Sequence, residues 1–148
     1  NTSSFTPPAT RLRTLTLLVL LFGMVGVIAE LLLIEHHETN TMWIPLVVLG
    51  VGTVIVLFRL VSPTRTADRA MAIVMSVFVV SGVLGLWFHV DGNRQFELEV
   101  YPSMDGFELF WESMTGATPA LAPGTMVLLG LIGLVVSVAV PQSNQESS

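Results

Sequence analysis

The residue best suited to chemistry is a glutamate inside an apolar stretch. Glu30 follows Ala29 and precedes three leucines, so an ionisable side chain lies where the chain is otherwise apolar. Such a group costs roughly 2.5–3.5 kcal/mol at mid-membrane on insertion scales, and it therefore faces protein, a cavity or a partner. Two roles stay open for Glu30. It relays protons or binds a cation, or it is hydrogen-bonded and only fixes packing inside a bundle or against a partner.

All three histidines are expected at one membrane depth, together with several carboxylates. Glu35-His36-His37-Glu38 lies at the outer end of the first apolar stretch, and His89 and Asp91 lie at the outer end of the third. Histidine nitrogens with carboxylate oxygens form a ligand set for a divalent metal ion such as zinc. One hypothesis is therefore an outer-face metal site built from His37, His89 and Glu30. Because no His-x-x-x-His spacing fixes two ligands on one helix face, the other is that these are interfacial residues without a cofactor.

Four apolar stretches must position these residues, at 15–34, 42–58, 71–89 and 123–140. Each is about long enough to cross a hydrocarbon core of ~30 Å at ~1.5 Å per residue. A backbone in lipid must satisfy its own hydrogen bonds, so apolar segments of this length are expected to be helices. The sequence thus predicts an all-α integral membrane protein with four transmembrane helices. They form a single transmembrane domain over 1–148, with flexible tails at 1–10 and 141–148.

Composition agrees with a membrane protein and excludes several chemistries. Hydrophobic residues make up 52 % of the chain and charged residues only 11 %. The chain has no cysteine, which excludes disulfides, thiolate metal sites and Cys-x-x-Cys redox pairs. A net charge of −5 argues against nucleic acid as a partner, because phosphate contacts require a basic surface.

The arginines predict how the helices are oriented. Five of the six cations precede the first stretch or lie between the second and third, namely Arg11, Arg13, Arg59, Arg65 and Arg69. This positive-inside pattern places both termini in the cytoplasm and the acidic loops on the outer side of the cell membrane. In the basic link that follows the second stretch, Ser62–Pro63 predicts a turn. Thr66 is the expected cap of the third helix, with Asp68 in its first turn.

The segment 91–122 is the longest part outside the four stretches and is expected on the outer side. Asp91-Gly-Asn indicates a turn, and the alternation in 96–101 indicates a short extended piece. Residues 105–115 then predict a short amphipathic interfacial helix. Its apolar residues recur at helical spacing, at Phe107, Phe110, Trp111 and Met114.

Small and aromatic residues indicate where helices or partners meet. Glycines recur two or three residues apart in each stretch, which permits close helix contact. Gly50 and Gly82 fall near the depth of Glu30, so a close-packed site around that carboxylate is one expectation. The predicted partner-facing residues are Glu30, Trp43, Trp87, Phe107 and Trp111.

Together these features favour an accessory or structural subunit of a larger membrane complex. The expected partners are the lipid bilayer and other membrane protein subunits. The alternative is an outer-face metal-binding or ion-handling protein that uses Glu30, His37 and His89. In size and span number the chain resembles small bacterial inner-membrane proteins in a general way, which assigns a role to no residue.

Overall fold

The computed structural model describes residues 8–33, 43–116 and 121–138, and every regular element in these ranges is a helix. The helices are α1 (Pro8–Leu33), α2 (Trp43–Val61), α3 (Arg65–Val100), α4 (Gly106–Thr115) and α5 (Leu121–Val138). Four of them, all except α4, are long and apolar enough to span a membrane. The predicted all-helical architecture with four membrane-span-like helices is therefore confirmed.

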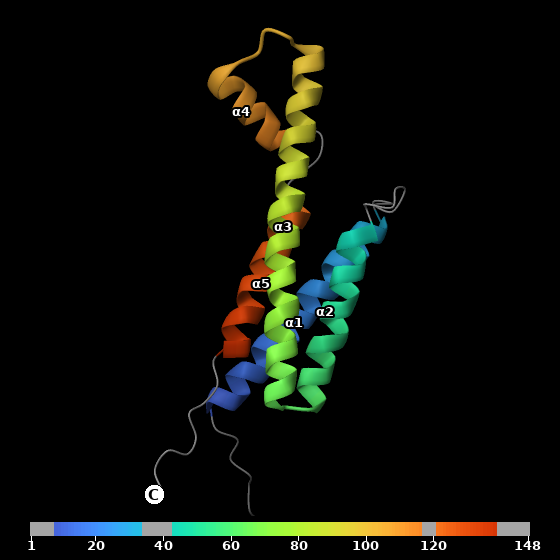
Figure 1. The fold of residues 1–148 in the computed structure, drawn as a ribbon, viewed down its shortest axis with the longest axis vertical. Coiled ribbons are helices and arrows are strands. Elements are labelled where there is room, and N and C mark those ends of the chain that lie inside the picture. Colours follow the sequence, from blue (N-terminus) through green and yellow to red (C-terminus); the bar gives the residue numbers. More distant parts are fainter. Residues whose placement is uncertain (1–7, 34–42, 117–120, 139–148) are drawn as a thin grey trace, which may run out of the picture.

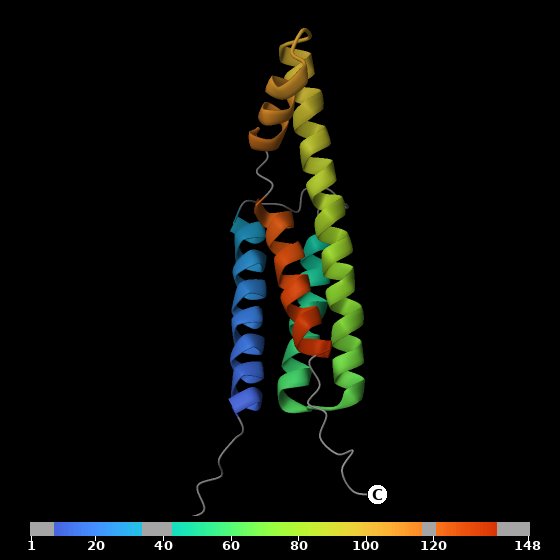
Figure 2. The ribbon, with the colours of Figure 1, turned by 90° about the vertical axis from the view of Figure 1, so that its left-hand side faces the viewer.

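The four long helices form a closed ring in the order α1, α2, α3, α5. Each helix packs along the next, and α5 closes the ring onto α1. Helices α1 and α3 stand diagonally opposite, and among the described residues an ion pair between Arg13 and Asp68 joins them at one end. The helices alternate in direction, so the start of α1, the α2–α3 link and the end of α5 lie at one end of the bundle (Figure 1, Figure 2). The arginines near the start of α1, the end of α2 and the start of α3 consequently lie at that end.

Helix α3 is longer than predicted and projects beyond the other end of the bundle (Figure 1). Its 36 residues measure about 54 Å at 1.5 Å per residue, well beyond the ~30 Å that a span requires. The predicted turn at Asp91 and extended piece at 96–101 are wrong, because the helix continues to Val100. Gln95 Nε2 donates to Asp91 Oδ2 at 2.8 Å across one helical turn, and packing by α4 supports the same segment.

Two helix starts also differ from the predictions. Helix α1 begins at Pro8, so residues 8–10 are helical rather than part of an extended tail. Proline suits the first turn of a helix because its missing N–H would have no intrahelical partner there. Helix α3 is capped by Thr64, whose Oγ1 accepts from the backbone N–H of Ala67 at 3.2 Å, and not by Thr66.

The bundle core is apolar and lies between the four long helices. Its largest fully buried side chains are Phe78, Leu20, Met24, Leu49, Met71, Met75 and Val56. Only 22–39 % of each span is buried inside the bundle, so most apolar side chains point outward. An outward apolar surface of this kind matches a lipid environment.

Helices α3 and α5 approach most closely because glycines lie at their crossing. A Cβ added at Gly82 would lie 2.7 Å from the carbonyl oxygen of Pro123, and one at Gly130 would lie 2.8 Å from that of Met75. In contrast, a Cβ at Gly26 or Gly50 would meet no described atom within 4 Å. Some glycines therefore lie at a close helix contact, whereas others lie where an added methyl group would meet no described atom.

Candidate protein-docking site

The projecting half of α3 and the short helix α4 form a hairpin beyond the bundle, here called the α3–α4 hairpin (residues 90–116). Asn93 and Ser113 join its two arms and are both buried. Asn93 Nδ2 donates to the backbone carbonyl of Ser113 at 3.1 Å. A Cβ at Gly116 would lie only 2.9 Å from Asn93 Cγ, so the end of α4 is held close to α3. Gly106, with φ +55°, adopts the left-handed conformation at the start of α4.

The face of α4 that packs against α3 is not its apolar face. Leu109, Ser113 and Gly116 are partly or fully buried and recur at helical spacing on one side. The opposite side carries the most apolar residues of the helix, and all of them are exposed: Phe107, Phe110, Trp111 and Met114. The predicted apolar stripe thus exists, but it covers none of the described residues of this chain.

These four exposed side chains lie on one side of α4, here called the aromatic face. The ring of Phe107 lies 6.3 Å from that of Phe110 and 6.2 Å from that of Trp111, measured between centroids. Phe107 is 75 % exposed although it is the centre of both contacts. An aromatic cluster open to its surroundings is typical of a surface that binds protein or lipid, because large aromatic side chains dominate interface energies.

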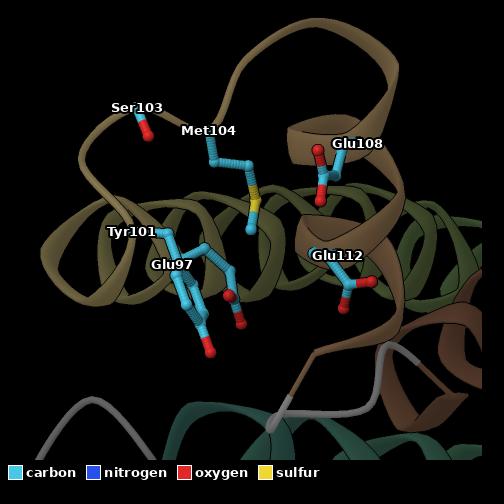
Figure 3. A pocket seen from close by; sticks show the side chains of 6 residues that line it. All are labelled: Glu97, Tyr101, Ser103, Met104, Glu108 and Glu112. Atoms are coloured by element: carbon cyan, nitrogen blue, oxygen red, sulfur yellow. The ribbon is translucent and has the colours of Figure 1, made fainter.

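An acidic pocket lies between the two arms of the hairpin (Figure 3). Glu97 and Tyr101 come from the end of α3, Ser103 and Met104 from the link, and Glu108 and Glu112 from α4. Three carboxylates share the pocket, and none of them forms a salt bridge with a described residue. An uncompensated negative pocket of this kind attracts a cationic group, such as an arginine or lysine side chain of a partner.

The other residues predicted to face a partner are also on the surface. Trp43 begins α2 and is 49 % exposed, and Trp87 lies on α3 and is 67 % exposed. Glu30 lies on the outward side of α1 and is exposed. Among the described residues, the close-packed site expected around Glu30 does not form, since a Cβ on Gly50 would meet no atom within 4 Å and one on Gly82 would meet α5.

The predicted metal ligands are not brought together in the part of the chain that the structure describes. Glu30 belongs to α1 and His89 to α3, which stand on opposite sides of the ring. His37 lies outside the described residues. Within the described ranges, no three histidine, aspartate or glutamate side chains are placed to hold one ion. The metal site remains a prediction of the sequence.

The sequence analysis missed an ionic cluster at the opposite end of the bundle. Asp68 Oδ1 accepts from Arg13 Nη2 and from Arg59 Nε, each at 2.5 Å. This arginine–aspartate cluster joins α1, α2 and α3 through one carboxylate oxygen. A signal was present, because Asp68 stands among five arginines near the ends of these helices. Taken along the sequence alone, Asp68 predicts only a favourable charge in the first turn of α3.

Comparison with models of protein families, with curated proteins and with solved structures finds no match to this chain.

Proposed function

We propose that this chain is an accessory or structural subunit of a larger membrane complex, and that it binds another subunit through the α3–α4 hairpin. The observation that carries this proposal is the orientation of α4. The side that carries Ser113 packs on α3, while the aromatic face is turned outward and left uncovered by the described residues. Burying an apolar side chain gains about 1.5–3 kcal/mol, so four exposed ones favour association.

The partner surface is expected to be apolar at its centre and basic at its edge. Aromatic anchors surrounded by polar groups are the usual arrangement of a binding hot spot. The pocket beside the aromatic face contributes Glu97, Glu108 and Glu112, which complement arginine or lysine. An acidic hairpin suits anionic lipid poorly, because helices that bind such lipid carry lysine and arginine on their polar side.

The same proposal places the hairpin on the outer side of the cell membrane. The arginine-rich end of the bundle is then cytoplasmic, in line with the positive-inside rule. The sequence favours a flat position for α4 at the membrane interface. The contact of α4 with the projecting half of α3 favours instead a position above the membrane, within reach of the outer part of a partner subunit.

Purification of the complex in a gentle detergent, followed by native mass spectrometry, tests the docking proposal. We expect a second membrane protein at a fixed stoichiometry with the wild-type chain. The double variant Phe107→Ala with Trp111→Ala should lose it, because both anchors of the aromatic face are gone. Phe22→Ala is the matched control, since Phe22 is 81 % exposed on α1, far from the hairpin. This variant should retain the partner.

Charge gives a second arm of the same experiment. Glu108→Gln with Glu112→Gln should weaken the complex, and ~1 M salt should weaken the wild-type complex similarly, because the Debye length falls to about 3 Å. A monomer without any co-purifying protein would contradict the proposal. So would a complex that survives loss of both aromatic anchors.

The alternative function is outer-face metal binding or ion handling by Glu30, His37 and His89. It rests on the residue types and their expected common depth, and it concerns a different surface from the hairpin. Elemental analysis of the purified chain tests it directly. Zinc or iron at one equivalent, lost in His37→Ala and in His89→Ala, would support this alternative.

A further inference from the structure

A second site is suggested at the arginine-rich end of the bundle, independent of the docking proposal. In the arginine–aspartate cluster, two guanidinium groups share one carboxylate, which leaves a net charge of +1. The three side chains are largely buried, with relative exposures of 16 % for Arg13, 7 % for Arg59 and 13 % for Asp68. A buried charge without a partner is costly, so this surplus calls for an anion.

Hydrogen-bond donors are also in excess in this cluster. Each guanidinium carries five N–H donors, whereas the two salt bridges use one nitrogen of each. Arg13 Nε is buried and has no hydrogen-bond partner among the residues that the structure describes. Leaving a buried donor unsatisfied costs free energy, and an acceptor at this position would remove the cost.

The position of the cluster narrows the choice of anion. Arg13 lies near the start of α1, Arg59 near the end of α2 and Asp68 near the start of α3. These helix ends lie together at one end of the bundle (Figure 2). In a membrane-spanning bundle this is the depth of lipid headgroups, and arginine recognises phosphate through its planar set of donors.

We propose that the arginine–aspartate cluster binds a phosphate group, with Arg13 as the principal donor. Asp68 holds the two guanidinium groups in place, and the phosphate supplies the missing negative charge. The phosphate belongs to an anionic lipid headgroup or is free phosphate. Both have the same chemistry at the cluster, and the experiment separates them.

The lipid arm uses the full chain in detergent, with native mass spectrometry after addition of phosphatidylglycerol or phosphatidylcholine. The wild-type chain should retain phosphatidylglycerol in preference to phosphatidylcholine. Arg13→Gln should lower that retention about tenfold, equivalent to about 1.4 kcal/mol. Arg69→Gln is the matched control: it removes the same charge at the same end of the bundle, from an exposed residue outside the cluster. This variant should bind nearly as the wild type does.

The second arm measures thermal unfolding of the chain in inorganic phosphate and in chloride at equal ionic strength. Stabilisation by phosphate that Arg13→Gln abolishes, without lipid retention, would identify free phosphate as the ligand. Equal losses in Arg13→Gln and Arg69→Gln would overturn the proposal, because they indicate a general basic surface. If Arg13→Gln does not fold, the wild type alone decides. In that case, a wild-type chain that shows no preference for phosphatidylglycerol and no stabilisation by phosphate would overturn the proposal.

Discussion

Glu30 is the residue at which the two proposed functions differ. Its side chain is exposed on α1 and forms no hydrogen bond with the described residues. Glu30 therefore does not fix packing among the described residues of the bundle. Two environments remain for its side chain. Glu30 contacts another subunit, or it reaches the polar membrane edge and handles an ion. An exposed carboxylate on a span favours a partner, because contact with lipid is costly.

Substitution of Glu30 distinguishes contact with another subunit from ion handling at the membrane edge. Glu30→Gln keeps the size and the hydrogen-bonding capacity and removes the charge, so the assembled complex should be almost unchanged. Glu30→Leu should weaken assembly by roughly 1–3 kcal/mol, because a buried partner group loses its acceptor. The isolated chain should unfold at the same temperature in both variants, since Glu30 is exposed in it. Native mass spectrometry measures assembly and circular dichroism measures unfolding.

One result would show that the packing interpretation of Glu30 is wrong. If Glu30→Gln assembles normally but the complex loses its activity, the negative charge itself is required. Glu30 would then relay protons or hold a cation, and the ion-handling alternative would gain support.

At the scale of the helices, the α3–α5 crossing depends on backbone contact at glycine. Gly130→Ala should destabilise the bundle, by about 1–3 kcal/mol, since its Cβ would lie 2.8 Å from a carbonyl oxygen of α3. Gly26→Ala is the matched control, because its Cβ meets no described atom within 4 Å. It should leave stability unchanged or raise it by up to ~1 kcal/mol through helix propensity. Unfolding in detergent micelles measures both, and destabilisation of equal size would contradict the close contact.

The four long helices could be predicted from the sequence because a continuous apolar run is a strong local signal. The projecting half of α3 could not. Asp91-Gly92-Asn93 has the composition of a turn, and a glycine inside a helix costs about 1 kcal/mol relative to alanine. That local cost is outweighed by tertiary contacts, chiefly the burial of Asn93 against Ser113 of α4. Such contacts become visible only when the two helices are placed side by side.

In the candidate docking site, too, the local sequence pattern predicts one part and tertiary packing decides the other. Helical spacing correctly placed Phe107, Phe110, Trp111 and Met114 on one side of a short helix. Spacing alone does not say which side packs inward, and here the side with Ser113 does. The arginine–aspartate cluster is similar, since Arg13 and Asp68 are 55 residues apart and meet only after three helices assemble.

At the scale of the whole molecule, the two ends of the bundle differ in charge and in construction. One end holds the arginine–aspartate cluster within the helices, and the other extends into the acidic α3–α4 hairpin. The two proposals therefore use opposite ends, a phosphate site at one and a protein-docking site at the other. The docking proposal further assumes one orientation, with the arginine-rich end in the cytoplasm and the hairpin outside.

That orientation can be tested with single cysteines, because residues 1–148 contain none. Ser103→Cys places one thiol in the link between α3 and α4, and Thr66→Cys places one at the opposite end of α3; both positions are exposed. A membrane-impermeant maleimide should label Ser103→Cys on intact cells and Thr66→Cys only after the membrane is opened. The reverse pattern would invert the orientation and move the hairpin into the cytoplasm. Labelling of both thiols on intact cells would show that α3 does not cross the membrane at all.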